Sequence, residues 1–292
     1  MPEVSVIIPN YNHAQYLVQR IDSVLTQTYT DIEIIILDDN STDNSRDIIA
    51  GYKEHQNISK IIFNDTNSGS PFSQWEKGIA EAKGKWIWIA ESDDYASPDF
   101  LETLLKLANE NEYTGIAYSG SNWVDAKGEA GADLSVHKQS FYRAGIEEIR
   151  KFLSWQCTIQ NVSSAIIRRD LAVEAIKGLA AYRACGDWIF YIRILQQAAL
   201  AHTGQKLNYF RWYHNNISNT AKNNGAWLTE GIQVLNNIDT RKVKFTFFEF
   251  FRMAKVWAGV IRRTAGNHKK ERDILMSIIR RYLKLTKPAR HE

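Results

Sequence analysis

Short apolar runs alternate with amphipathic stretches along the first part of the chain. Runs of mostly apolar, often β-branched or aromatic residues predict buried strands at 4–9, 32–37, 60–63 and 86–89. Between them apolar residues recur every three or four positions, as at Leu17, Ile21 and Val24, and this spacing predicts helices. Strands that alternate with helices favour βαβ units with right-handed crossovers. The pattern therefore predicts a Rossmann-like, mostly parallel sheet flanked by helices.

The pattern continues less regularly to about residue 220. It predicts helices at 100–109, 146–155 and 170–176, another that opens at Gly186, and strands at 115–119, 161–168 and 207–213. Residues 128–139 form a polar loop with little periodicity. Two helices with apolar and basic faces are predicted within 245–261 and 274–285. The chain is therefore divided into an α/β domain, residues 1–222, and a basic, amphipathic helical C-terminal segment, residues 223–292.

Acidic clusters follow two of the predicted strands. Asp38 and Asp39 end the second strand, and Glu91, Asp93 and Asp94 follow the fourth. Open α/β sheets bind ligands at the carboxyl ends of their strands, so we expect both clusters to face one crevice. Crowded carboxylates repel one another, and such oxygen ligands suit Mg²⁺ or Mn²⁺, which commonly bridge to phosphates. A solvated acidic turn that caps the next helix is the alternative.

Neither a P-loop nor a G-x-G-x-x-G motif occurs in the sequence. A nucleotide site is therefore expected to hold a diphosphate through a cation rather than through a glycine-rich loop. Nucleotidyl transfer on a similar sheet is disfavoured, because the chain lacks the glycine-rich, lysine-bearing N-terminal loop expected for that reaction.

Length and composition indicate a soluble globular protein. The 292 residues are enough to bury a full core, and 44% of them are hydrophobic and 24% charged. The cysteines, Cys157 and Cys185, are too few for a disulfide framework or a zinc site. The N-terminus shows no signal-peptide pattern, and no apolar run approaches the length of a membrane span. We therefore expect a cytoplasmic protein.

Charge is distributed unevenly along the chain. Residues 241–292 carry 15 Lys and Arg against 4 Asp and Glu, whereas residues 1–240 carry 21 against 29. Attachment of the basic segment 241–292 to an anionic membrane surface is one explanation. Packing on the α/β domain, or on a second subunit in a homodimer, is another. No recognised motif supports nucleic-acid binding, so no nucleic-acid partner is expected.

Six short motifs occur in the chain: SVIIPNYN at 5–12, LDDNSTD at 37–43, Asn67 with Gly69, ESDD at 91–94, Gly-Asp-Trp at 186–188 and FRWYH at 210–214. Their order and spacing resemble those of the inverting nucleotide-sugar glycosyltransferases of the GT-A fold, the bacterial family 2 type that builds polysaccharides and O-antigen. The resemblance covers about residues 3–220. It implies a GT-A catalytic domain, a nucleoside-diphosphate sugar as donor, and Mn²⁺ or Mg²⁺ as cofactor.

The resemblance also implies roles for individual residues. The residues that it implies for donor binding are Pro9, Tyr11, Asp38, Asp39, Asn67, Glu91, Ser92 and Arg211. Within that set Asp38 is the preferred contact to the base, and Arg211 offsets phosphate charge. The metal ligands are Asp93 and His214, and the acceptor side includes Asp94 and Trp188. Trp75, Trp155 and Trp188 are candidates for walls on which a sugar stacks. A core position is an equal alternative for Trp75 and the favoured one for Trp155 and Trp188.

Asp187 matches the catalytic base of the family. Inversion in one displacement needs a carboxylate to take the proton of the acceptor hydroxyl as its oxygen attacks the anomeric carbon. Members often carry Glu-Asp here, whereas Gly186 precedes Asp187, so a supporting carboxylate is absent. Residues 74–76 read Gln-Trp-Glu where the family often has Ala-Arg-Asn. The alternative for Asp187 is a simple helix cap.

Together these features predict a metal-dependent inverting glycosyltransferase. The expected donor is a UDP- or dTDP-sugar, with guanine left open, and the expected acceptor is a hydroxyl of a glycan or of a lipid-linked glycan. Such an enzyme would lie peripherally on the inner face of the cell membrane. A non-catalytic nucleotide-sugar- or glycan-binding module on the same fold is the alternative from another class.

Overall fold

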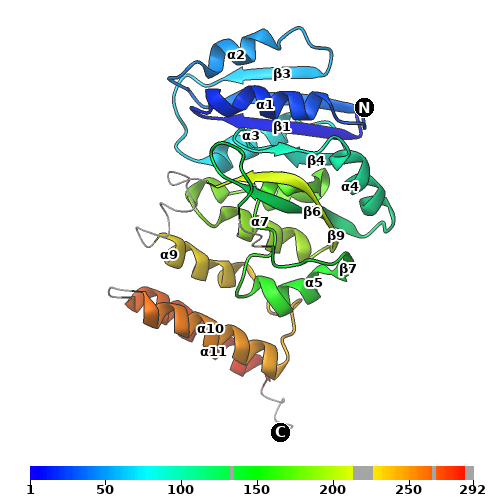
Figure 1. The fold of residues 1–292 in the computed structure, drawn as a ribbon. Helices are drawn as coiled ribbons and strands as arrows, with labels where there is room; N and C mark the ends of the chain where they lie inside the picture. The colour runs from blue at the N-terminus through cyan, green and yellow to red at the C-terminus, as the bar shows by residue number, and fades with distance from the viewer. Residues whose placement is uncertain (132–134, 213–225, 265–267, 287–292) are drawn as a thin grey trace.

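The computed structural model describes residues 1–131, 135–212, 226–264 and 268–286, and Figure 1 shows their course. Within these residues nine strands form one sheet, and helices pack on both of its faces. The predicted α/β fold with a central sheet flanked by helices is confirmed.

The first half of the sheet is parallel, as its apolar runs predict. β1 (Val4–Asn10) lies between β2 (Ile32–Asp38) and β4 (Trp86–Ile89), and β3 (Ile58–Phe63) lies on the outer side of β2. The helices of this half are α1 (Ala14–Leu25), α2 (Ser45–Gly51) and α3 (Pro71–Glu81). Every residue of β1, β2 and β4 is buried, because helices cover both faces of a parallel sheet.

Alternation along the strands divides the core into two layers. Val6 and Ile8 of β1 belong to the layer of α1 and α4 (Phe100–Asn109). Ile7 belongs to the opposite layer, with residues of α3 and α7 (Gly186–Leu195). Because apolar burial contributes roughly 25 cal/mol per Å², these two layers hold the strands firmly and position the loops at their carboxyl ends.

The second half of the sheet mixes strand directions. β8 (Ala165–Arg168) is antiparallel to both β4 and β6 (Thr114–Val124), and β9 (Ala199–Arg211) lies parallel to β6. β5 (Tyr95–Ala96) and β7 (Phe141–Ala144) are antiparallel to β9. The strand order is β3-β2-β1-β4-β8-β6-β9-β5, with β7 also on β9. The sequence pattern misses β5, β7 and the start of β9, because such short strands and a stretch with Gly204 and Lys206 show no clear period.

Short helical segments link the sheet to α7. α5 (Gly145–Glu148) continues as a π-helical turn, η1 (Ile149–Leu153). The strand predicted at 161–168 begins instead with a 3₁₀ turn, η2 (Val162–Ser164), and only its second half is β8. α6 (Arg169–Ala175) and η3 (Leu179–Ala181) precede α7. These segments bring α7 to the same side of the sheet as α3.

The C-terminal helices pack on the α/β domain. They are α9 (Ala226–Gln233), η4 (Val234–Asn237), α10 (Phe247–Arg263) and α11 (Lys269–Thr286), and α10 and α11 lie at the end of the molecule farthest from β3 (Figure 1). Trp257 of α10 stacks near Trp188 of α7, with 6.0 Å between ring centroids, and it belongs to the core layer of α3 and α7. Of the alternatives that the sequence left open for this segment, packing on the α/β domain is the one that these contacts show. The proposed boundary near residue 222 falls in 213–225, outside the described residues.

The opposite face of α10 remains exposed. Phe247, Phe248 and Phe251 are 69%, 81% and 58% exposed, and the ring of Phe247 lies against the rings of the other two. We call these three residues the aromatic cluster. Lys255 and Arg262 lie on the same exposed side of the helix. No helix of the described residues is both long and apolar enough to cross a bilayer.

Candidate functional site

A cleft of about 500 Å³ opens at the carboxyl ends of β1, β2 and β4. Parallel strands of an open sheet place their ligand sites at this edge. The predicted site residues that line it are Pro9, Tyr11, Asp39, Asn67, Glu91, Ser92, Asp93, Asp94 and Arg211. Residues from loops far apart in sequence thus converge on one hollow, as the two acidic clusters predict.

The acidic cluster of residues 91–94 is built into its surroundings. Trp75 Nε1 donates to Glu91 Oε1 at 2.7 Å. The Asp94 carboxylate accepts from Asn161 Nδ2 at 2.8 Å and Ser163 Oγ at 2.7 Å. These contacts hold the carboxylates close together and away from bulk water.

Burial and mutual repulsion make this cluster electrostatically unfavourable. Burial, with the negative charge of Asp93, raises the pKa of Glu91 to about 8 and that of Asp94 to about 6. Arg20 offsets part of this charge, and its Nε donates to the Glu91 carbonyl at 2.8 Å. Its two terminal nitrogens have no hydrogen-bond partner among the described residues, and burial lowers its pKa to about 10. A cation in the cleft would relieve the repulsion among the carboxylates.

The described residues do not form a complete metal cage. No group of three or more His, Cys, Asp and Glu side chains in the described part of the chain could hold a metal ion by itself. Mg²⁺ and Mn²⁺ sites in phosphate-binding proteins often use one or two carboxylates, with substrate phosphates and water completing the shell. Asp93, on the wall of the cleft, fits such a partial site. The other predicted ligand, His214, lies outside the described residues.

Arg211 holds the acidic loop rather than reaching out for a ligand. Its Nε donates to the Asp93 carbonyl at 2.8 Å, and its backbone N–H donates to Asp94 Oδ1 at 2.9 Å. The terminal nitrogens donate to the carbonyls of Asp125 and Ala126 and to Gln19 Oε1. All three guanidinium nitrogens thus have partners within the chain. That Arg211 offsets phosphate charge stays a prediction: it lines the cleft, but its donors are engaged within the chain.

The second acidic pair divides into a buried and a cleft-facing residue. Asp38 is fully buried and accepts from Asn10 Nδ2 and from Arg46 Nε at 2.9 Å. Burial alone would raise the pKa of Asp38, but hydrogen bonds from Ser41, Arg46 and Asn10 outweigh it and lower the pKa. Asp39, and not Asp38, is among the described residues that line the cleft. Of the pair, Asp39 is thus the residue that faces the cleft, whereas the resemblance preferred Asp38 as the contact to a base.

The cleft also contains residues that were not predicted from the sequence, among them His13, Gln74 and Asn161. His13 Nδ1 lies 2.8 Å from Ser92 Oγ, and Gln74 Nε2 donates to Asp39 Oδ1 at 2.8 Å. Asn161 holds Asp94, as described above. Gln74 lies in the 74–76 segment that departs from the family pattern, and that departure is the one sequence signal that pointed to it.

Asp187 and Trp188 lie at the N-terminus of α7, and neither is among the described residues that line the cleft. Asp187 Oδ1 accepts from the backbone N–H of Trp188 at 2.7 Å. Burial raises the pKa of Asp187 to about 6, although hydrogen bonds from the backbone N–H groups of Trp188 and of Asp187 itself lower it. Trp188 is buried, and its Nε1 donates to the Leu153 carbonyl at 2.8 Å. Trp188 is therefore a core residue, and its assignment to the acceptor side is corrected.

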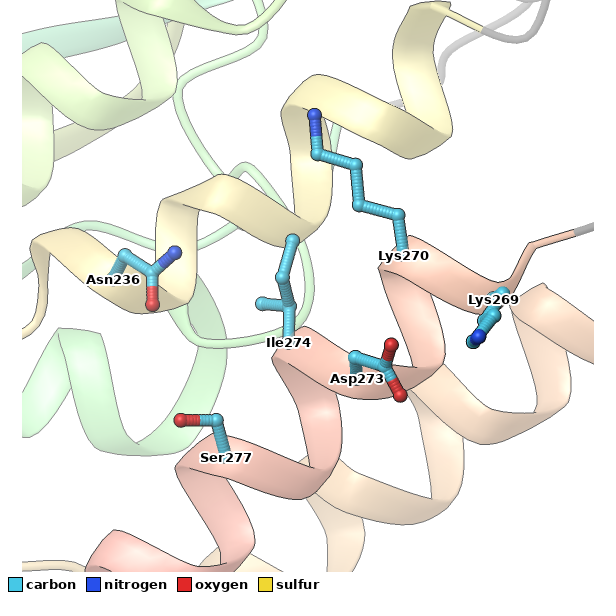
Figure 2. A pocket seen from close by; sticks show the side chains of 6 residues that line it. All are labelled: Asn236, Lys269, Lys270, Asp273, Ile274 and Ser277. Carbon is cyan, nitrogen blue, oxygen red and sulfur yellow. The ribbon is translucent and has the colours of Figure 1, made fainter.

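A second hollow, of about 680 Å³, lies between η4 and α11. Figure 2 shows Asn236 on one side of it and Lys269, Lys270, Asp273, Ile274 and Ser277 on α11. Its lysines and Asp273 are exposed, and it contains none of the predicted site residues. The cleft beside residues 91–94 is therefore the candidate active site.

The chain is similar to known glycosyltransferases. The profile described as Glycosyl transferase family 2 matches residues 5–174. The glycosyltransferase GlyG of Streptococcus pneumoniae serotype 4 is 34% identical over 125 residues, which are 43% of this chain and 41% of GlyG. The chain covers less than two thirds of the length of the curated relatives it matches.

Solved structures share the fold at low sequence identity. TarS residues 1–349 of S. aureus in complex with UDP-GlcNAc superposes with a TM-score of 0.66 and 16% identity, covering 98% of this chain and 82% of TarS. The mannosyltransferase PcManGT of Pyrobaculum calidifontis, in complex with GDP-Man and Mn²⁺, gives a TM-score of 0.61 and 13% identity, covering 98% and 88%. These likenesses show that the fold is that of GT-A-like glycosyltransferases.

Proposed function

The chain belongs to glycosyl transferase family 2 and is a glycosyltransferase, and we propose that it transfers a sugar with inversion from a nucleoside-diphosphate donor to an acceptor hydroxyl. The observation that carries this proposal is the partly buried acidic cluster of residues 91–94 on the wall of a cleft of about 500 Å³. A cleft of this size suits a nucleotide sugar. The cluster supplies the oxygen ligands that a cation bound to a diphosphate requires.

The nucleoside lies against Asp39, Asn67 and Tyr11 in this proposal. Asn67 Nδ2 donates to the Asp39 carbonyl at 3.0 Å, so the two residues form one wall of the cleft. Pro9 and Ser92 complete that end. A UDP- or dTDP-sugar is the proposed donor. The ligands in TarS and PcManGT carry different bases, uracil in UDP-GlcNAc and guanine in GDP-Man. The base that this chain binds is therefore tested by direct measurement.

The proposal includes a divalent cation, Mn²⁺ or Mg²⁺. Asp93 would hold it, with His214 as the second protein ligand and Glu91 near its shell. When bound, such an ion neutralises charge that develops on a departing diphosphate. Arg20 and Arg211 keep the loop of residues 91–94 in place beneath the diphosphate position.

Asp187 is the proposed general base. Its carboxylate takes the proton of the acceptor hydroxyl while that oxygen bonds to the anomeric carbon and the bond to the diphosphate breaks. A pKa of about 6 leaves Asp187 ionised at neutral pH and still basic enough to accept a proton. Asp94 is proposed to stand on the acceptor side of the cleft.

The acceptor is proposed to be a glycan carried on a lipid, as in polysaccharide or O-antigen assembly. The exposed aromatic cluster of α10 and the excess of Lys and Arg in 241–292 support attachment to an anionic membrane surface. In this proposal the enzyme lies peripherally on the cytoplasmic face of the cell membrane, where the acceptor and a soluble donor meet.

Thermal unfolding with nucleotides tests the donor site. We expect UDP or dTDP with Mn²⁺ to raise the unfolding temperature, and GDP and ADP to raise it less. A ligand at 100 times its Kd adds about 2.7 kcal/mol to the free energy of unfolding. Asp93→Asn should remove the part of the shift that needs the metal. No shift with any of the four diphosphates, with or without Mn²⁺, would contradict the proposed donor site.

A further inference from the structure

A carboxylate from the C-terminal segment holds the start of α7. Glu230 of α9 accepts hydrogen bonds from three successive backbone N–H groups, those of Arg183, Ala184 and Cys185. The distances from these nitrogens to Glu230 Oε2 are 3.1, 2.7 and 3.0 Å, and Arg183 N also lies 2.9 Å from Oε1. Hydrogen bonds to an ionised acceptor are roughly twice as strong as neutral ones. This contact therefore fixes the chain segment that leads directly into Asp187.

The position before Asp187 has no room for a side chain. A Cβ placed on Gly186 would lie 2.7 Å from the ring of Phe72, which is itself buried. A carboxylate at position 186, adjacent to Asp187 in sequence, would thus require the buried ring of Phe72 to shift. Glu230 brings a carboxylate to the same end of α7 from a different part of the chain.

The held segment also touches the rim of the donor cleft. The Arg183 guanidinium donates to the Gly69 carbonyl, and Ser70 Oγ donates to the Tyr182 carbonyl at 3.3 Å. Gly69 and Ser70 both line the cleft. One carboxylate therefore ties together three parts of the protein: the C-terminal helices, the segment of Asp187 and the cleft rim.

Resting on the proposed function, we propose that Glu230 is a positioning residue for sugar transfer. Its hydrogen bonds to residues 183–185 set the orientation of Asp187, and its negative charge acts on the Asp187 carboxylate. In this way the C-terminal helices become part of the catalytic apparatus rather than an appendage. Glu230 does not itself take the proton, because its oxygens are occupied by backbone N–H groups.

Glu230 is the charged group among the titratable side chains that interact with Asp187 in the described residues. Among the described residues, the titratable groups that interact with Asp187 include Cys157, Cys185, Tyr191 and Glu230. Burial raises the pKa of both thiols and of the Tyr191 hydroxyl, so these three groups are neutral at physiological pH. Glu230 is then the one anion in this set, and removing its charge should make Asp187 easier to ionise.

Two substitutions separate the geometric effect from the charge effect. Glu230→Gln keeps an oxygen for the three N–H groups and removes the charge, so we expect kcat at its plateau to stay near the wild-type value. The acid limb of the pH profile should move to lower pH. Glu230→Ala loses the hydrogen bonds, and we expect kcat to fall about tenfold or more, since small misplacements of a catalytic group are costly. The KM for the donor should also rise, because the rim at Gly69 is released.

Glu271→Gln is the matched control. Glu271 accepts from Thr229 Oγ1 at 2.8 Å, so it also anchors α9, one residue before Glu230, but it makes no contact with residues 183–185 among its hydrogen bonds in the described structure. We expect it to change neither kcat nor the pH profile. An equal loss in Glu271→Gln and Glu230→Ala would overturn the proposal, because general docking of α9 would then explain both. An unmoved acid limb in Glu230→Gln would overturn the role of the charge.

Hydrogen exchange tests the contact without relying on activity. The amides of Arg183, Ala184 and Cys185 should exchange faster in Glu230→Ala than in the wild type, and remain protected in Glu230→Gln. If they stay protected in Glu230→Ala, the positioning role is wrong. Wild-type protein that transfers no sugar from any donor would instead contradict the proposed function, and these exchange rates would still report on Glu230.

Discussion

The indole N–H of Trp75 donates to Glu91 at 2.7 Å, and this hydrogen bond ties α3 to the acidic cluster of the cleft. Trp75 is buried, so its N–H cannot exchange this acceptor for solvent at low cost, whereas Glu91 is half-buried at the cleft. Trp75 is thus neither a sugar-stacking wall nor merely an apolar core residue. It is a buried ring whose single donor orients one carboxylate of the candidate metal site.

Trp75→Phe should weaken ligand binding in the cleft, while the Phe ring still fills most of the space of the indole in the core. We expect a loss of about 1–3 kcal/mol in the free energy of unfolding, because Glu91 is left with an unsatisfied buried oxygen. The Kd for a nucleoside diphosphate with Mn²⁺ should rise several-fold. Trp86→Phe is the control: Trp86 is equally buried, but its Nε1 has no partner among the described residues. A loss in Trp86→Phe as large as in Trp75→Phe would show that ring volume, not the hydrogen bond, matters.

Asp187→Asn should separate catalysis from donor binding. Removing a general base costs roughly 10²- to 10⁴-fold in kcat, while the cleft itself is unchanged. Donor affinity, measured by calorimetry with UDP or dTDP and Mn²⁺, should stay within a few-fold of the wild type. Unchanged turnover would contradict the assignment of Asp187. A wild type that binds the donor and transfers no sugar would favour the non-catalytic module.

The pKa of Asp187 predicts opposite effects of pH on activity and stability. Because burial raises it from 3.8 to about 6, the base is protonated at low pH, and kcat should fall as pH drops through about 6. For folding, a raised carboxyl pKa means that stability is fullest below the unfolded pKa and is lost as pH rises through the folded one. Asp187→Asn should therefore have a larger free energy of unfolding than the wild type at pH 7–8. This difference should shrink as the pH falls and disappear near pH 4. Denaturant unfolding across this range checks the sign.

The parallel half of the sheet was predictable because its signal is local. Continuous apolar runs end in acidic residues, and one window of sequence shows both the strand and the side chains at its carboxyl end. β5 and β7 carry no such signal, since pairing with β9 alone defines them. The contacts of Arg211 and Glu230 are likewise invisible in sequence. Most of their partners are backbone groups, of residues 93, 125–126 and 183–185, and a backbone group leaves no residue-specific mark.

Arg211→Lys tests whether the guanidinium supports the loop or only carries charge. Lysine keeps the positive charge, but its single nitrogen cannot reach Asp93, Ala126 and Gln19 together. We expect a loss of at least about 3 kcal/mol in the free energy of unfolding, as for other buried charge networks. Denaturant unfolding measures it. A stable Arg211→Lys variant with weakened diphosphate binding would support the assignment of Arg211 to phosphate.

Attachment to a membrane through the aromatic cluster is tested with lipid vesicles. The cluster combines three exposed Phe side chains with nearby Lys and Arg, and burial of each ring in the interface is worth roughly 1.5–3 kcal/mol. We expect the protein to sediment with vesicles that contain anionic lipid, less with neutral ones, and less at high salt. Replacing Phe247, Phe248 and Phe251 by Ser should abolish this binding and leave transfer to a soluble acceptor unchanged.

Tyr113→Ser serves as the control for membrane binding, and dimerisation through the aromatic cluster is the competing explanation. Tyr113→Ser removes a 67% exposed aromatic side chain from the loop between α4 and β6, outside the basic C-terminal segment, and should not affect sedimentation. If the aromatic cluster instead covers a second copy of the chain, the wild type will be a dimer in solution and the triple variant a monomer, with no lipid dependence in either. The salt response decides between these cases. An interface with anionic lipid weakens as charges are screened, whereas an apolar contact between Phe rings does not.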